Sequence, residues 1–189
     1  MAFLKERLQK LAGITNPQML TESARPYDDE AKKMIHDVPA YLRAIHLWFH
    51  GAHHTTRGAD FAGDHAYLYT RIYTEVQDEV DGAIEKAIGV TGEQRMACPK
   101  CLTEHAVEIL GKYANPPELE PRDIAKEGLH MIEDYISMIE HTFKVLESKG
   151  MLTLGMDDQL AASANTHETY VYLLKQRVRS YDDVSQNLL

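Results

Sequence analysis

The chain has 189 residues, of which 44% are hydrophobic and 26% are charged. These fractions are close to the averages of globular proteins and argue against a wholly disordered chain. The 20 Lys and Arg residues are outnumbered by 29 Asp and Glu residues, and the net charge of −9 argues against a protein whose entire surface binds nucleic acid phosphates, although a basic tail could still bind them locally. No run of about 18 apolar residues occurs, and residues 1–13 lack the apolar core of a signal peptide. We therefore expect a cytoplasmic protein.

Residues 28–56 have the pattern of an amphipathic helix. Apolar residues recur every three or four positions from Met34 to Phe49, and acidic residues at the start suit the positive end of a helix dipole. Pro39 lies inside this run, so the sequence predicts that the helix begins or bends there. Residues 1–27 are expected to be an N-terminal tail or extension.

A second long helix follows, with Asp60 or Asp64 expected as its cap. The glycines at the ends of segment 89–92 indicate where it stops. A short helix is predicted around residues 102–113, before a Pro-rich connector at 115–121.

Two more long helices are predicted, over about 123–149, which Gly150 stops, and over about 157–181. No segment shows the alternation of a strand. Four long helices with one short helix between the second and the third predict an all-α, ferritin-like four-helix bundle over residues 28–181. Residues 182–189 are expected to be a C-terminal tail.

The histidines are concentrated in one part of the chain. Histidine is the commonest side-chain metal ligand and titrates near neutral pH, so a cluster predicts metal or proton chemistry, although single histidines more often fill polar helix faces. Of the ten histidines, the clustered ones are His36, His46, His50, His53, His54 and His65. Three of them share one helix face: His46, His50 and His53. They could transfer protons, bind a second metal, or simply form a partly buried row of histidines.

The segment from His50 to His65 resembles the signature of the Dps family, the miniferritins. In that signature a glycine, a phenylalanine and a second histidine follow the first ligand histidine at fixed offsets. Gly58, Phe61 and His65 stand at those offsets from His53.

Two further motifs support the resemblance. Asp81 and Glu85, followed by Lys86, reproduce the acidic pair of the family's second helix. Segment 167–174 is similar to the family's last-helix motif, with Tyr172 where Trp is usual.

The resemblance implies a ferroxidase site that two chains share. Two histidines of one subunit, here His53 and His65, would meet an Asp and a Glu of its two-fold mate, here Asp81 and Glu85. Imidazole and carboxylate together suit Fe(II), and Zn(II) is the alternative ion for the same site. His54 replaces the Trp that usually follows the first histidine, and it is either an additional ligand or a surface residue.

The function implied is that of a homo-oligomeric shell, expected to be a dodecamer. Such a shell would oxidise Fe(II) with hydrogen peroxide, store ferric iron and protect against oxidative stress. The excess of acidic residues is consistent with iron storage, because negatively charged pores and cavities attract cations. The alternative is a nucleoid-binding structural shell with little ferroxidase activity, but the basic residues near both ends of the chain are interspersed with acidic ones.

The chain departs from the family pattern in the spacing between the second histidine and the acidic pair. His65 and Asp81 are sixteen residues apart, one more than is usual in the family. Without compensation the ligand positions would fall on Val80 and Ile84, which cannot bind a metal. A one-residue helix bulge would restore the register, and such bulges often occur at functional sites.

Other carboxylates and histidines offer alternatives. Asp78 and Glu79 would become the better ligands if the register is not restored. If none of these carboxylates binds a metal, the whole acidic run would be a solvated helix face. Ferritins with a site inside the bundle need a Glu-x-x-His motif on two helices. The only plausible instance here, Glu127 with His130, is most simply accidental.

Cys98 and Cys101 form a single CxxC motif. With His105 the pair supplies three zinc ligands, whereas structural zinc takes four. A redox CxxC normally opens a helix in a thioredoxin-like context, whereas here the sequence predicts that the pair lies in the connector. Idle thiols are the first reading, an inter-subunit metal or disulfide the second, and redox function the third.

Overall fold

The computed structural model describes residues 27–179, and within that range it contains helices and no strand. The long helices are α2 (Asp29–Thr55), α4 (Thr70–Thr91), α6 (Pro121–Ser148) and α7 (Leu154–Val178). The shorter elements are α3 (Phe61–Gly63), the π-helix η2 (Asp64–Tyr69), the 3-10 helices η3 (Gln94–Ala97) and η4 (Pro116–Glu118), and α5 (Pro99–Leu110). The all-α bundle expected from the sequence is confirmed. The tails expected at 1–27 and 182–189 lie, apart from residue 27, outside the described residues.

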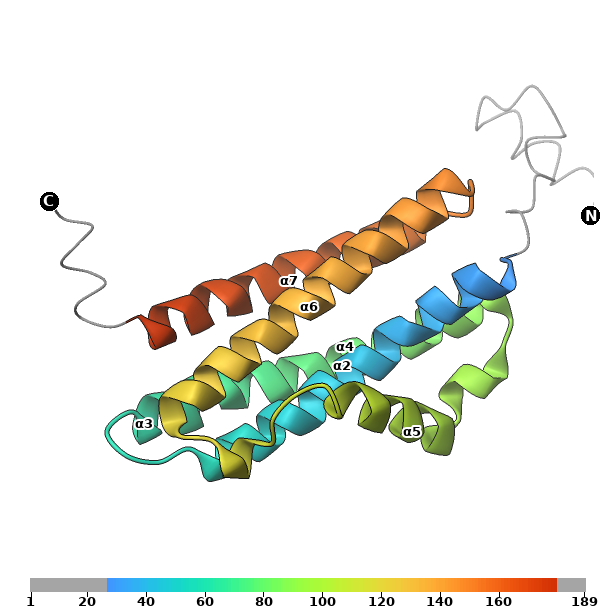
Figure 1. Cartoon of the computed structure of the whole chain (residues 1–189). Coiled ribbons are helices and arrows are strands. Elements are labelled where there is room, and N and C mark those ends of the chain that lie inside the picture. Colours follow the sequence, from blue (N-terminus) through green and yellow to red (C-terminus); the bar gives the residue numbers. More distant parts are fainter. Residues whose placement is uncertain (1–26, 180–189) are drawn as a thin grey trace, which may run out of the picture.

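Figure 1 shows the path of the chain through the helices, and ion pairs join the ends of neighbouring helices. Arg57, just after α2, pairs with Glu120, just before α6, at 2.9 Å. Lys149, just after α6, pairs with Asp28, just before α2, at 2.6 Å, so these two helices are antiparallel. Because α4 ends beside the start of α2, the connection through α5 to α6 must cross the length of the bundle. This long crossover is the ferritin-like arrangement.

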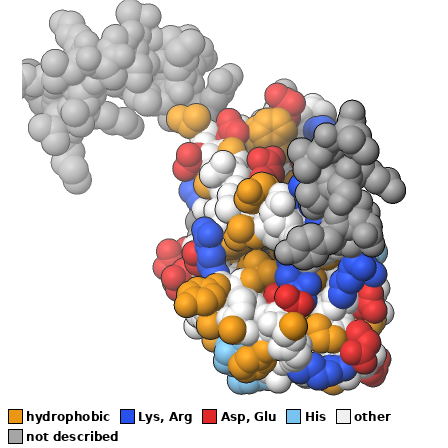
Figure 2. Space-filling view, turned by 90° about the vertical axis from the view of Figure 1, so that its left-hand side faces the viewer, with side chains coloured by type: hydrophobic (Ala, Val, Ile, Leu, Met, Phe, Trp, Pro, Cys, Tyr) orange, Lys and Arg blue, Asp and Glu red, His pale blue; other side chains and the backbone are white. Residues whose placement is uncertain are grey.

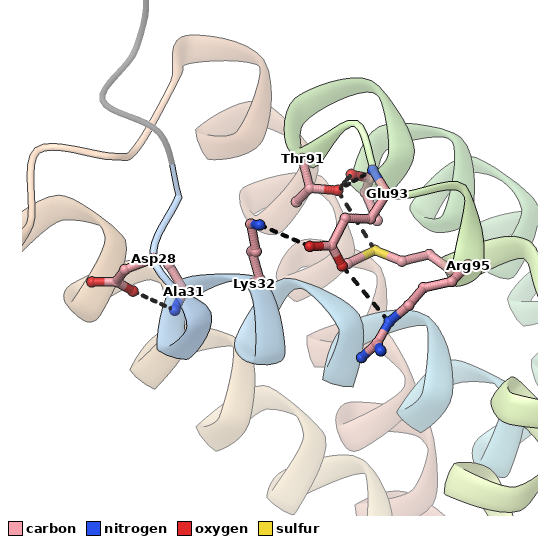
Figure 3. Close-up of polar contacts among 8 residues, drawn as sticks. Asp28, Ala31, Lys32, Thr91, Glu93 and Arg95 are labelled. Carbon is pink, nitrogen blue, oxygen red and sulfur yellow. Dashed lines mark hydrogen bonds and ion pairs between the residues drawn. The ribbon is translucent and has the colours of Figure 1, made fainter.

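The start of α2 is fixed to the end of α4 by polar contacts (Figure 3). The Asp28 carboxylate accepts a hydrogen bond from the backbone N–H of Ala31 at 2.9 Å and caps α2. One turn later, Lys32 pairs with Glu93 at 2.8 Å. Glu93 also lies 3.7 Å from Arg95, so the turn after α4 holds its carboxylate between two cations.

The core lies between the two helix pairs, α2 with α4 and α6 with α7. Helix α6 approaches α2 closely at Gly128, where an added Cβ would lie 2.8 Å from Cζ of Phe49 and 3.1 Å from Cζ3 of Trp48. Glycine therefore permits the contact between these two helices. Within residues 27–179 no helix is both long and apolar enough to cross a membrane.

The structure refines three expectations about helix boundaries. Helix α2 begins at Asp29, as the pattern over residues 28–56 predicts, and it runs through Pro39 rather than starting there, because Asp28 caps the helix and Pro39 packs in the core. Of the two caps expected for the second long helix, Asp60 stands at the N-cap of α3, which leads into η2 and α4, whereas the buried Asp64 carboxylate is bonded to Arg177. Helix α5 starts at Pro99 rather than near residue 102, because proline is well suited to the first helical position.

Candidate metal site

His53 and His65 form a stacked pair where α2 ends and η2 begins. Their ring centroids are 3.8 Å apart and their planes differ by 18°. The Nδ1 atom of His53 lies 3.0 Å from the carbonyl oxygen of His65, and the Nδ1 atom of His65 lies 2.9 Å from the carbonyl oxygen of His53. Figure 2, which looks at the α3 end of the bundle, shows histidine side chains reaching the surface. The two histidines that the sequence motif pairs therefore lie side by side in the structure.

The reciprocal contacts define the tautomer of both rings. A carbonyl oxygen can only accept, so each Nδ1 carries a proton; in a neutral ring of this tautomer Nε2 has the lone pair that binds a metal. Partial burial, ahead of contacts with nearby histidines, lowers the pKa of His53 and favours its neutral form. In their neutral forms the two rings could offer two Nε2 atoms to a metal.

Thr70 completes this arrangement. Its hydroxyl donates to the carbonyl oxygen of His65 at 2.6 Å and lies 3.0 Å from Nδ1 of His53. The hydroxyl can therefore accept from His53 while it donates to His65. No sequence motif singled out Thr70, since its role depends on the path of the chain between the two histidines.

The one-residue bulge expected after His65 is present as the π-helix η2. In an uninterrupted α-helix, sixteen residues would place Asp81 about 160° around the axis from His65, whereas one inserted residue returns it to about 60°. Val80 is buried in the core and Asp81 is exposed, as this register requires. The π-helix therefore places the acidic pair on an exposed face of α4.

A buried ion pair anchors the start of η2. Asp64 is 2% exposed and accepts two hydrogen bonds from Arg177 near the end of α7, at 2.8 and 3.0 Å. Arg177 also lies 3.0 Å from Asp60. This contact ties the backbone next to His65 to a distant helix, and nothing in the sequence indicated it.

The histidine pair and the acidic pair are far apart within one chain. Sixteen residues separate His65 from Asp81, which corresponds to roughly 24 Å along a helix axis. Within the described residues 27–179 no group of three or more His, Cys, Asp or Glu side chains could hold a metal ion. Asp81 and Glu85 are exposed and accessible to a second chain.

His54 turns toward His50. Their Nε2 atoms are 3.2 Å apart, and both side chains are exposed. Tyr73 of α4 lies beside this row, with its ring 5.0 Å from that of His50 and 5.3 Å from that of His53. His46, one turn earlier, contacts the carbonyl oxygen of Tyr73 through Nδ1 at 3.0 Å.

Glu79 is not part of a solvated acidic face, as the sequence allowed, but points into the bundle. Its Oε2 atom lies 3.6 Å from Nε2 of His167, which is fully buried, and neither atom has a hydrogen-bond partner. Burial raises the pKa of Glu79 to about 7 and lowers the pKa of His167 to about 4. Burial thus favours the uncharged form of both groups.

The remaining candidates have local partners. Glu127 accepts a hydrogen bond from the backbone N–H of Ala114 at 2.8 Å, and His130 is exposed beside Asp134. Cys98 caps α5 and accepts from the N–H of Cys101 at 3.3 Å, so the CxxC pair opens a helix rather than lying in a connector. Both thiols are free, and their mutual contact lowers the pKa of Cys98 and raises that of Cys101.

Comparison with known proteins gives a structural likeness. No protein-family model matches the chain, and no curated protein matches it. Among solved structures, Dps from Mycobacterium smegmatis in a tetragonal form is similar, with a TM-score of 0.65 and 16% identity, over 81% of this chain and 88% of that one. At this identity the likeness shows the fold, and the chain has the ferritin-like helical bundle seen in that Dps.

Proposed function

We propose that the chain forms a homo-oligomer that oxidises Fe(II) and stores ferric iron. In this proposal His53 and His65 of one subunit and Asp81 and Glu85 of a second subunit form each site. The single observation that carries the proposal is the π-helix, because it restores the spacing of the iron-binding motif where the sequence alone breaks it.

The donor set suits the reaction. Neutral imidazoles and carboxylates bind Fe(II) as substrate and leave coordination positions open for an oxidant. With hydrogen peroxide, two Fe(II) ions each lose one electron, the O–O bond breaks, and two protons complete two water molecules. The carbonyl oxygens that accept from Nδ1 orient both imidazoles. The two carboxylates would offset the rising positive charge of the iron.

The assembly follows from the separation of the two ligand pairs. Because about 24 Å of helix separates them, a shared ion requires a second chain placed antiparallel across a two-fold axis. A dodecameric shell, as implied by the resemblance to Dps, would contain such dimers and enclose a cavity for the mineral. Zn(II) fits the same donors and should compete with Fe(II). His54, which the resemblance left open as an additional ligand, turns toward His50 and is not counted among the four ligands of this site.

Ligand variants test the proposal directly. His65→Ala and Asp81→Ala should abolish rapid Fe(II) oxidation by peroxide, measured by absorbance, and leave the assembly intact by light scattering. His141→Ala and Asp78→Ala are matched controls, since both residues are exposed. A wild-type rate in Asp81→Ala would contradict the proposal and favour Asp78 instead.

The second candidate function is a DNA-binding shell. The chain carries a net charge of −9, and basic residues such as Lys175 and Arg177 already pair with Glu133 and Asp64. We therefore expect weak DNA retention at low salt that disappears steeply as salt rises. Tight retention at physiological salt, with slow iron oxidation, would favour the DNA-binding alternative.

A further inference from the structure

We propose that His50 and His54 form a second metal site, confined to one chain, for a late transition-metal cation of the Zn(II) and Cu(II) class. The two residues lie one turn apart on α2, and both are exposed. Their Nε2 atoms are 3.2 Å apart and their ring centroids 4.8 Å apart. The site needs no second subunit, so it does not rest on the proposed iron chemistry.

The separation of the two nitrogens matches a chelate. With metal–nitrogen bonds of about 2.05 Å, a 3.2 Å edge corresponds to an angle of about 100° at the metal. This value lies between the octahedral and the tetrahedral angle. An imidazole pair on one helix turn can therefore bind a cation without a change of backbone.

The kind of cation follows from the donors. Imidazole suits zinc, copper and nickel, and the affinity of such sites for divalent ions rises from iron to copper. The described residues 27–179 provide no cluster of three ligands here, so water would complete the coordination. The His50–His54 site should thus differ in selectivity from the mixed imidazole and carboxylate site proposed for Fe(II).

Neighbouring rings pack against the His50–His54 pair. The ring of His46 is stacked 6.1 Å from that of His50, and the ring of His53 lies 4.8 Å from that of His54. These contacts restrict the rotation of the two imidazoles and help to keep their Nε2 atoms close together.

The test uses the full-length oligomer, stripped of metal with a chelator. His65→Ala serves as the background, because it disables the proposed iron site. Calorimetric titration with Zn(II) should show one high-affinity ion per chain in this background, and adding His50→Ala or His54→Ala should weaken that binding at least tenfold. Adding His141→Ala, an exposed histidine on α6, should leave it unchanged.

Spectroscopy with Cu(II) provides a second measurement. Electron paramagnetic resonance should show coupling to two imidazole nitrogens in the His65→Ala background and to fewer after either substitution. Circular dichroism verifies that each variant keeps its helices. Equal Zn(II) affinity and unchanged nitrogen coupling in His50→Ala and His54→Ala would overturn the proposal. Failure of the iron proposal would show separately, as a wild-type oxidation rate in His65→Ala.

Discussion

Two of the histidine environments in this bundle differ sharply. Where α2 ends and η2 begins, His53 and His65 are partly exposed, and each directs its Nδ1 proton at a carbonyl oxygen. In the core, His167 is fully buried, donates from Nδ1 to the carbonyl oxygen of Ser163, and directs its Nε2 at Glu79.

The difference shows what decides the role of a histidine. Both environments fix the tautomer in the same way, through a backbone carbonyl. Of these two environments, that of the outer pair, His53 and His65, leaves Nε2 accessible to a cation, whereas burial favours the uncharged forms of the inner pair, His167 and Glu79. We therefore expect metal chemistry at the outer pair and a pH-dependent contribution to stability from the inner one.

The largest expected effect concerns the anchor of the outer pair. Arg177→Ala should lower the free energy of unfolding by about 3 kcal/mol, because it leaves the buried Asp64 carboxylate without its cation. Urea denaturation at fixed protein concentration measures this, with Lys175→Ala as the control for an exposed ion pair. Equal losses in the two variants would show that the Asp64–Arg177 contact does not anchor η2.

The next prediction concerns the inner pair and pH. The pKa of Glu79 is raised to about 7 from 4.5, so the folded state holds a proton that the unfolded state has lost, and stability falls as pH rises through this window. Glu79→Gln should therefore be more stable than the wild type by about 2–3 kcal/mol at pH 8. The advantage should vanish near pH 4.5.

His167 acts in the opposite direction. Its pKa is lowered to about 4 from 6.5, so falling pH destabilises the folded state in this range while it relieves Glu79. The two effects on stability oppose each other in the wild type. The difference in the free energy of unfolding between Glu79→Gln and the wild type is therefore the clearer measurement. If this difference in unfolding free energy stays constant from pH 4.5 to 8, a protonated Glu79 is ruled out.

The smallest expected effect concerns Thr70. Thr70→Val removes the hydroxyl that links His53 to the carbonyl oxygen of His65, and it should slow Fe(II) oxidation about tenfold, as outer partners of metal-binding histidines do. Thr70→Ser should restore the rate. Thr74→Val is the control, because the Thr74 hydroxyl bonds only to carbonyl oxygens of its own helix. Equal rates in all three variants would remove Thr70 from the site.

The fold was predictable because its helices have strong apolar periodicity and clear ends. Gly92, for example, adopts a positive φ of 74° where the sequence predicted that α4 stops. Helix α2 does not start at Pro39, because the local rule against proline in helices is outweighed by an earlier cap and a buried position. Local propensity does not include such tertiary contacts.

The candidate site was predictable only in part. Fixed spacing paired His53 with His65, whose rings stack in the structure, and the extra residue before Asp81 correctly indicated a bulge. Contacts between distant segments leave no pattern of spacing in the sequence. Arg177 meets Asp64, and Glu79 meets His167, only after the helices have packed.

Mixed assembly is the most direct test of a site shared between chains. Shells of His65→Ala or Asp81→Ala alone should be inactive. Random mixing of the two variants makes half of the dimers heterodimers, each with one intact site of two, so activity should recover to about a quarter of wild type. Native mass spectrometry verifies the mixing. No recovery at any mixing ratio would contradict the shared site and place the chemistry within a single chain.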